Sequence, residues 1–173
     1  MVHALFADGS ACEVRVEVDA GPEPKVFVLG QPSRELLLSA ERGVNAAQLA
    51  LRRRKVLART YATFCELLTG TGATSTVLGE SAGLAFALAF TAAALERERG
   101  KSLALAVAAT GMVASGGADA VIQRVDSVGT KLRGALEILS PGGAVLYPAA
   151  NGGDVTDEVR EAARSKSVRL VPV

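Results

Sequence analysis

The chain has 173 residues, a length that suits one domain with a hydrophobic core of its own. Its 19 basic and 18 acidic residues give a formal net charge of +1. This balance gives no support for nucleic acid or an anionic membrane surface as the main partner. Hydrophobic residues make up 49% of the chain but aromatic residues only 4%, so we expect a core built from alanine, valine and leucine.

No segment has the pattern of a membrane span or a targeting signal. The longest fully apolar run, around residues 82–95, is too short to cross a bilayer. The first residues lack the basic region and the long apolar core of a signal peptide. Cys12 and Cys65 form no metal-binding motif, and we expect two small buried apolar residues rather than a disulfide. A cytoplasmic protein without a membrane partner is the expectation that follows.

The chain begins with a β-rich segment. Residues 12–19 alternate apolar and polar side chains without a break, which is the pattern of a half-buried strand. Residues 21–24, Gly-Pro-Glu-Pro, are typical of a turn, and residues 25–29 form a second strand. Residues 2–7 are a candidate for a further strand. We therefore expect an N-terminal β-hairpin.

A long helix is expected from Pro32-Ser33 to about Arg54, because its apolar residues recur at helical spacing. It ends in the only dense basic run of the chain, residues 52–55. We expect a solvated helix end there, with contact to an acidic partner or a neighbouring subunit as the alternative. Residues 61–68 fit a helix by their period but also fit a strand. Residues 69–76 lack the Gly-Lys-Ser/Thr ending of a phosphate-binding loop, so no ATPase is expected in this chain.

The second half of the chain alternates helices and strands. This alternation indicates an α/β or α+β fold with a mixed sheet and packed helices. No internal repeat is visible, so we expect a single domain over residues 1–173. The expected helices are 82–98, 128 to about 139 and 154–165, and the expected strands are 102–108, 144–147 and 168–171, with a hairpin in 112–125 that turns around 115–117.

A serine between two glycines stands directly before the apolar helix, in the run Gly79-Glu80-Ser81-Ala82-Gly83. This pattern predicts a tight turn that delivers Ser81 to the first helical turn, where backbone N–H groups are unpaired and partially positive. Such donors can hold the oxyanion of acyl-transfer chemistry. Gly-x-Ser-x-Gly also marks the nucleophile of α/β-hydrolases, in which an acid and a histidine follow the serine. The single histidine, His3, precedes the serine, so that triad is excluded.

A lysine is the remaining candidate for a base that activates Ser81. Lys101 and Lys166 follow the serine in charged segments. Lys131 instead lies at the border of an apolar helical stripe, where loss of water lowers the pKa of an amine. A base at neutral pH needs a pKa of about 7–8, roughly 3 units below that of a free lysine, and burial is able to supply such a shift. The stripe consists of Val128, Leu132, Ala135, Leu136 and Leu139, whereas Arg133 and Glu137 point away from it.

These motifs resemble those of the Lon protease proteolytic domain. Residues 79–83 are similar to the family's Gly-Pro-Ser-Ala-Gly serine motif, and residues 125–135 are similar to its lysine motif. Thr110-Gly111 matches the place of a Thr-Gly pair in the family. Residues 148–151, Pro-Ala-Ala-Asn, are similar to the Pro-Ala-x-Asn ending of PDZ-associated Lon-like proteases. The resemblance covers roughly residues 77–153 with specific motifs and the flanks only loosely.

The sequence also departs from the family pattern. Glu80 stands where proline is usual, and Met112 stands where one form of the family has an acid. Asp126-Ser127 replaces a pair of glycines, and the spacing from Thr110 to Lys131 is about three residues longer than usual. The expected Ser-Lys pair is complete despite these departures.

The resemblance implies a Lon-like fold and a serine endopeptidase that hydrolyses peptide bonds in unfolded or partner-delivered protein. Ser81 would be the nucleophile and Lys131 its general base. Thr110 would orient the lysine amine, and backbone groups at Gly79, Glu80 and Ala82 would lie at the oxyanion.

Further expectations follow from the same resemblance. Residues 61–68 would be a strand that borders the site. The chain would self-associate, as relatives form hexameric rings, and a separate ATPase or delivery protein is a candidate partner. The Ser-Lys mechanism needs no metal or organic cofactor. Two alternatives stay open, a non-proteolytic Lon-like scaffold module and a small serine esterase.

Overall fold

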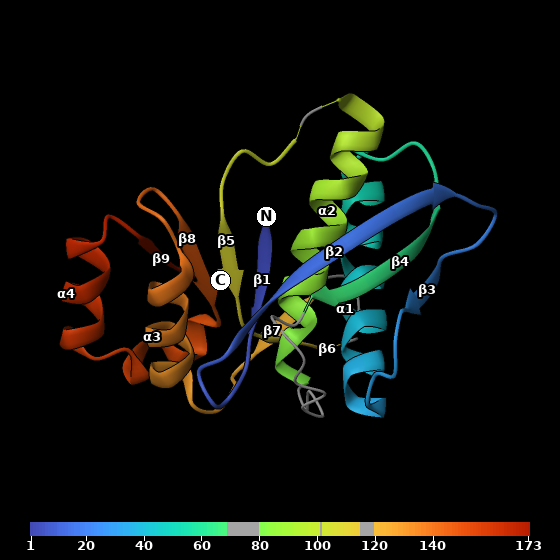
Figure 1. Ribbon diagram of the computed structural model, residues 1–173. Helices are drawn as coiled ribbons and strands as arrows, with labels where there is room; N and C mark the ends of the chain where they lie inside the picture. The colour runs from blue at the N-terminus through green and yellow to red at the C-terminus, as the bar shows by residue number, and fades with distance from the viewer. Residues whose placement is uncertain (69–79, 101, 115–119) are drawn as a thin grey trace.

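The computed structural model describes residues 1–68, 80–100, 102–114 and 120–173. Within these residues a mixed sheet of seven strands runs through the molecule, with helices packed on both of its faces (Figure 1). The expected α/β class with a mixed sheet is confirmed. In spatial order the strands of this sheet are β3 (Lys25–Val28), β4 (Tyr61–Leu68), β2 (Ala11–Ala20), β1 (Val2–Leu5), β5 (Val107–Ala109), β8 (Ala144–Tyr147) and β9 (Arg169–Pro172).

Helices and a small second sheet complete the described part of the chain. Two short 3-10 turns precede α2 and α4 and carry residues of the candidate site. These elements are α1 (Arg34–Arg53), η1 (Glu80–Ala82), α2 (Gly83–Arg99), β6 (Met112–Ala114), β7 (Val121–Gln123), α3 (Val128–Ile138), η2 (Ala149–Asp154) and α4 (Asp157–Ser165). No helix in the described residues is long and apolar enough to span a membrane.

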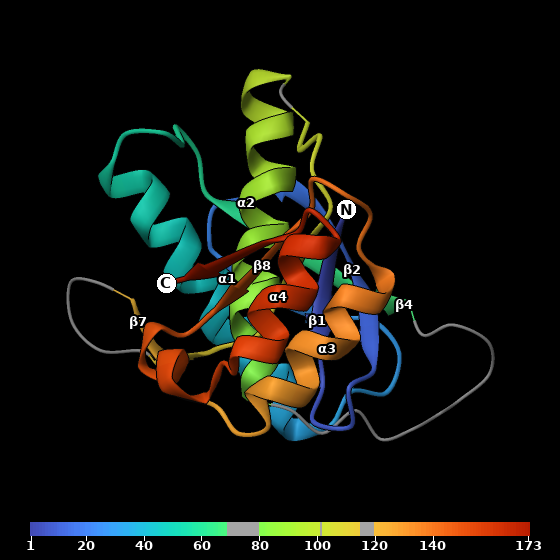
Figure 2. The same ribbon diagram turned by 90° about the vertical axis from the view of Figure 1, so that its left-hand side faces the viewer.

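The sheet separates two hydrophobic cores. The helices α1 and α2 cover one face, and α3 and α4 cover the other, which is the face toward the viewer in Figure 2. Side chains alternate along each strand, so Ala4 packs in the core with α1 and α2 while Leu5 packs in the core with α3 and α4. Alanine, valine and leucine make up most of both cores, as expected from the composition.

The hairpin expected from residues 12–19 and 25–29 is wrong. The N-terminal hairpin instead consists of β1 and β2, which pair antiparallel. β3 does not pair with β2, although it follows β2 in the chain. It pairs in parallel with β4, and β4 lies between β3 and β2. The reason is the helix α1, which links β3 to β4 and returns the chain to the same end of the sheet, so that the two strands run in the same direction.

The strands β1, β5, β8 and β9 are parallel, and their carboxyl ends meet at one edge of the sheet. Ligand sites of open α/β sheets usually lie at this edge. Two 3-10 turns and the first turns of α2 and α3 also lie at this end of the molecule (Figure 1). The candidate site is therefore expected here.

Most expected elements agree with the structure, and residues 61–68 form the expected strand, β4. The expected strand at 102–108 is wrong in its extent, because only Val107–Ala109 pair. Its neighbour β1 begins at Val2, so the preceding residues have no strand beside them. The helix expected at 154–165 begins at Asp157. Lys101 and the predicted turn at 115–117 lie outside the described residues.

Candidate functional site

Ser81 lies in η1, directly before α2, and backbone contacts hold this turn on two sides. Gly111 N–H donates to the carbonyl oxygen of Ser81 at 2.7 Å, and Leu84 N–H donates to the carbonyl oxygen of Gly111 at 3.0 Å. On the other side, Ser39 Oγ of α1 donates to the carbonyl oxygen of Glu80 at 2.9 Å. The serine turn is therefore fixed both to the segment after β5 and to α1.

The side chain of Ser81 is not a helix cap. Ala82 occupies the N-cap position of α2 and has no side chain that could serve as one. The hydroxyl of Ser81 instead accepts a hydrogen bond from the Nζ of Lys131, at 3.2 Å. Fifty positions along the chain separate the two residues, and they meet because the serine turn and the first turn of α3 lie at the same end of the sheet.

Lys131 is buried, with 3% of its surface exposed. The apolar stripe predicted for α3 is buried around it, while Arg133 and Glu137 are exposed as expected. Burial lowers the pKa of the Lys131 amine, and the nearby charge of Asp126 opposes this shift. Among the described residues, no carboxylate forms a salt bridge with Lys131. The amine is therefore in surroundings that favour its neutral form.

A buried asparagine fixes the segment that leads into α3. Asn151 is fully buried, and its amide makes a pair of hydrogen bonds with the backbone of Val125. Val125 N–H donates to Asn151 Oδ1 at 3.0 Å, and Asn151 Nδ2 donates to the carbonyl oxygen of Val125 at 2.9 Å. Two residues later, Ser127 has a φ of 57°, in the left-handed region, and its carbonyl oxygen accepts from the N–H of Lys131.

A carboxylate extends this connection to the surface. Asn151 Nδ2 also donates to Asp154, at 2.6 Å, and Arg124 donates to both oxygens of the same carboxylate, at 2.9 and 3.1 Å. We name Arg124, Val125, Asn151 and Asp154 the asparagine clamp. Sequence reasoning used Asn151 only as part of a family motif. The sequence did contain a signal for its structural role. Asn151 is a single polar residue that follows an expected strand and Pro148, with only alanine and glycine beside it.

Thr110 does not make the contact that was expected of it. It is fully buried directly after β5, and its backbone N–H donates to the carbonyl oxygen of Leu146. Its hydroxyl has no hydrogen-bond partner among the described residues, so no hydrogen bond to the Lys131 amine supports the orienting role expected of Thr110. The hydrogen bond recorded for that amine goes to Ser81.

The residues expected at the oxyanion lie around the start of α2. Ala82 is fully buried, and Glu80 is exposed. Gly79 lies outside the described residues. The N–H groups of a first helical turn lack partners within the helix, and the helix dipole places partial positive charge at this end. This position suits the stabilisation of a developing negative charge beside Ser81.

A scan against models of known protein families and a search of curated proteins found no match for this chain. Among the described residues there is also no group of three or more His, Cys, Asp and Glu side chains placed to hold a metal ion.

Proposed function

We propose that this chain is a serine endopeptidase in which Ser81 is the nucleophile and Lys131 its general base. The observation that supports this most directly is the 3.2 Å contact from Lys131 Nζ to Ser81 Oγ, made by a lysine that is only 3% exposed. A nucleophile within hydrogen-bond reach of its base is the arrangement that covalent acyl transfer needs. The similarity to the Lon serine and lysine motifs supports the same pair of residues.

In the proposed reaction, Lys131 carries one proton from the nucleophile to the leaving group. Neutral Lys131 removes the hydroxyl proton of Ser81 as the serine oxygen attacks the peptide carbonyl carbon. The C–N bond breaks when the ammonium of Lys131 gives this proton to the leaving amine, which leaves an acyl ester on Ser81. Water then attacks the ester with Lys131 again as base, and the product acid and the free serine are released.

The oxyanion of each tetrahedral intermediate would lie at the first turn of α2. Backbone N–H groups there, with that of the buried Ala82 directly after Ser81 as the candidate, would act as its donors. Loss of one such donor typically costs about 10²–10³ in kcat in serine enzymes. The hydrogen bonds from the Gly111 N–H and the Ser39 hydroxyl hold the turn in place, so these donors would need little rearrangement during the reaction.

The proposed substrate is polypeptide, unfolded or delivered by a partner, on the strength of the resemblance. Assembly into a ring and a separate ATPase or delivery protein belong to the same proposal. A Lon-like scaffold without activity is less favoured, because such a module has no need for a buried lysine in contact with a serine hydroxyl. A small serine esterase would use the same two side chains and differ in substrate.

The test is a peptidase assay over pH with casein and a fluorogenic peptide. We expect the rate to rise with pH through neutral values as Lys131 loses its proton, and both Ser81→Ala and Lys131→Ala to lower it by at least about 10²-fold. Lys25→Ala, at an exposed lysine of β3, is the matched control and should leave the rate unchanged.

Three outcomes would contradict the proposal. Activity that survives in Ser81→Ala would exclude this nucleophile. A wild-type protein that cleaves small esters but not peptides would identify an esterase. A folded wild-type protein that cleaves neither esters nor peptides, and whose Ser81 does not react with a fluorophosphonate, would favour the non-proteolytic scaffold.

A further inference from the structure

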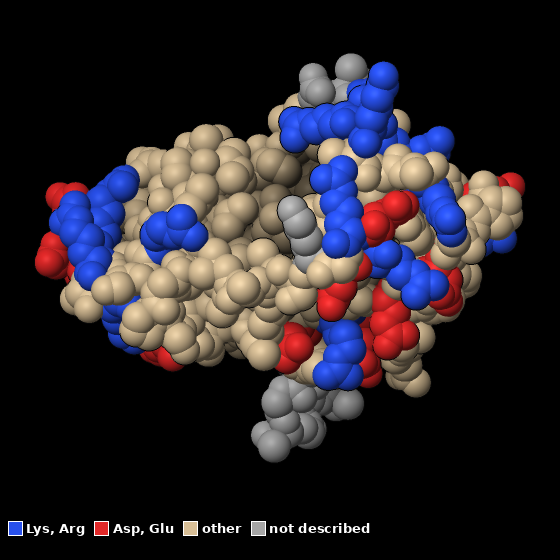
Figure 3. Space-filling model, turned by 90° about the horizontal axis from the view of Figure 1, so that it is seen from above, with Lys and Arg blue, Asp and Glu red and all other residues tan. Residues whose placement is uncertain are grey.

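Basic side chains gather at the end of the molecule opposite the candidate site. The helices α1 and α2 both end there, and Figure 3 looks down on this end. α2 has 17 residues, so at 1.5 Å per residue this surface lies about 25 Å from Ser81. We name it the basic end. Its members come from the last turns of the two helices and the segment before β4, namely Arg52, Arg53, Arg54, Lys55, Arg59, Arg97 and Arg99.

Two hydrogen bonds hold the basic end together. Arg99 of α2 donates to the carbonyl oxygen of Val56 at 3.4 Å, and Arg52 of α1 donates to the hydroxyl of Thr60 at 3.0 Å. The segment between α1 and β4 is therefore attached to both helices. Its arginine, Arg59, is brought beside α2 as a consequence.

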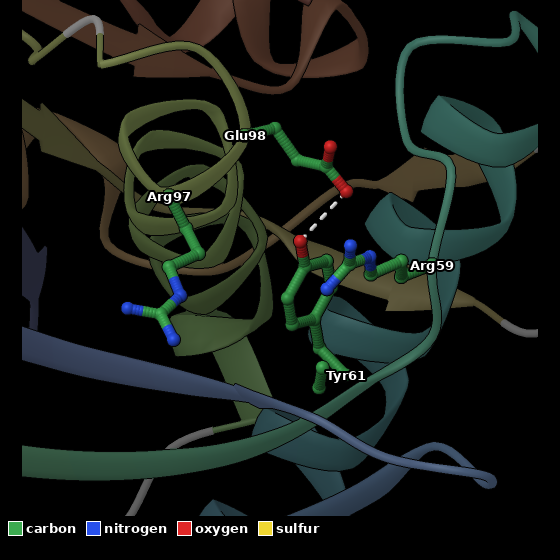
Figure 4. A pocket seen from close by; sticks show the side chains of 5 residues that line it. Arg59, Tyr61, Arg97 and Glu98 are labelled. Atoms are coloured by element: carbon green, nitrogen blue, oxygen red, sulfur yellow. Dashed lines mark hydrogen bonds between the residues drawn. The ribbon is translucent and has the colours of Figure 1, made fainter.

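A pocket of about 210 Å³ opens in the basic end, lined by Ala20, Arg59, Tyr61, Arg97 and Glu98. The guanidinium groups of Arg59 and Arg97 flank the phenol of Tyr61, as Figure 4 shows. The phenol donates to the Glu98 carboxylate at 2.7 Å. Among the described residues, neither arginine forms a salt bridge or a side-chain hydrogen bond, so both keep their donors for a ligand.

Helix dipoles alone do not account for this arrangement. One or two cations in a last turn suffice to offset the negative end of a helix, and Arg59 belongs to no helix. Placing seven basic residues within one end of a molecule with a net charge of +1 costs free energy through mutual repulsion. An anionic ligand removes this repulsion. A guanidinium pair on two sides of a small pocket matches a carboxylate, which accepts hydrogen bonds through both oxygens.

We propose that the basic end binds an acidic peptide segment of a partner protein, with one side-chain carboxylate bound at the pocket that Arg59 and Arg97 line. Asp19, Glu96 and Glu98 lie on the same part of the chain's surface and interrupt the positive field that a nucleic-acid backbone would follow. A flexible peptide can place separated carboxylates at the arginines and keep them away from Asp19 and Glu96, while Glu98 already accepts the hydrogen bond of the Tyr61 phenol. The charge pattern therefore favours a peptide over a nucleic acid. A second side chain of the segment would meet the run Arg53-Arg54-Lys55.

The chain carries its own reporter for this test. Tyr61 and Tyr147 are its only tyrosines, so a protein with isotope-labelled tyrosine gives signals from one ring in the pocket and one buried in β8. A short oligoglutamate peptide is titrated into the full chain, with oligoglutamine, inorganic phosphate and single-stranded DNA as separate arms at the same ionic strength. We expect oligoglutamate to shift the Tyr61 signal in a saturable way and to leave Tyr147 unchanged.

Arginine variants then locate the binding site. Arg59→Gln and Arg97→Gln should each weaken oligoglutamate binding by about tenfold or more, because each removes a charge-assisted hydrogen bond. Arg133→Gln, at an exposed arginine of α3, is the matched control and should bind as the wild type does. Circular dichroism verifies that each variant is folded. An unshifted Tyr61, wild-type affinity for oligoglutamate in the two pocket variants, or tighter binding of DNA or phosphate than of oligoglutamate would each overturn the proposal.

Discussion

At the scale of single residues, the cost of burying the charged Lys131 amine links the stability of the fold to the candidate site. A buried ammonium without a carboxylate partner is costly, because the low-dielectric interior does not replace its hydration. Lys131 lowers this cost by losing its proton, which is the same property that general-base chemistry requires. The stability of the protein and the proposed activity should therefore depend on the same titration.

This coupling predicts how stability changes with pH. The pKa of Lys131 is lowered in the folded protein, so between that value and the ordinary lysine pKa of about 10.4 the unfolded chain binds one more proton. Through this window the contribution of Lys131 to the free energy of unfolding therefore rises with pH. Its destabilising effect is largest once pH has fallen to the folded pKa, where the buried amine is charged. Lys131→Met removes this slope. Urea denaturation from pH 7 to 10 should show that the variant's advantage over wild type shrinks as pH rises, and a constant difference would contradict it.

The asparagine clamp gives a second prediction at this scale. Asn151→Leu leaves the N–H and C=O of Val125 without their partners, at a cost of at most about 1–3 kcal/mol for each group because the two hydrogen bonds are part-buried. We expect a loss of roughly 2–4 kcal/mol in urea denaturation and a fall in peptidase rate at temperatures where the variant stays folded.

The pH profile separates positioning from general destabilisation. If Asn151 positions Lys131 through residues 125–127, the midpoint of the pH–rate profile should move toward the ordinary lysine value in Asn151→Leu, because the amine gains water. Glu158→Gln, which removes an exposed salt bridge to Arg133 on the same side of the molecule, is the control and should keep the midpoint. An unchanged midpoint in Asn151→Leu would show that the clamp serves stability alone.

At the scale of elements, close approaches of backbone decide where the two site residues stand. A Cβ added at Gly43 of α1 would overlap the carbonyl group of Gly83 at the start of α2. A Cβ added at Gly134 of α3 would overlap the carbonyl group of Gly9 in the β1–β2 hairpin. The start of α2 and the helix α3 therefore each pack closely against a neighbouring segment, at a position where only glycine leaves room for the backbone.

Gly43→Ala tests the close packing of α1 against the start of α2. Alanine is about 1 kcal/mol better than glycine in a helix interior, so propensity alone predicts stabilisation. The overlap with the Gly83 carbonyl should reverse the sign, with a net loss of about 1–3 kcal/mol from overpacking. Activity should fall as well, since the Ser39 bond to the serine turn depends on the same helix contact. Asn45→Ala, at an exposed position of α1, is the control, and a variant as stable as this control would contradict the prediction.

At the scale of the whole molecule, the sheet and its two cores shield both cysteines. Cys12 in β2 and Cys65 in β4 are free and buried, as expected from the sequence. Burial raises the pKa of the Cys65 thiol to about 12 and also raises that of Cys12. A thiol in this state is a poor nucleophile near neutral pH. Its reactivity should therefore report on opening of the fold.

Thiol labelling should be slow in the native protein and fast after unfolding. In Cys12→Ala, iodoacetamide at pH 8 should modify Cys65 at the rate of global or sub-global opening, and the rate should rise with urea as stability falls. Ser140→Cys in the same background adds an exposed thiol and serves as the reactive control. Native labelling of Cys65 as fast as that of the added thiol would show that the core around β4 opens on its own.

Sequence reasoning predicted single elements well and their partners less well. The alternation in residues 12–19 and the apolar stripe around Lys131 depend only on which side of an element is buried, so local periodicity was sufficient for both. The length of β5 and the partner of β3 depend on neighbours far along the chain, and no local pattern contains them. The contact expected of Thr110 failed for the same reason, since it required the relative placement of three separate segments.

The sequence by itself determined the α/β class, the position of Lys131 at the border of an apolar stripe and the serine turn before an apolar helix, because each is a matter of side-chain type and spacing within one segment. Only the tertiary structure decided that Ser81 and Lys131 touch, that Asn151 holds the approach to α3, and that Arg59 and Arg97 face one pocket. These are contacts between residues 26 to 50 positions apart, and their geometry follows from sheet order and helix packing.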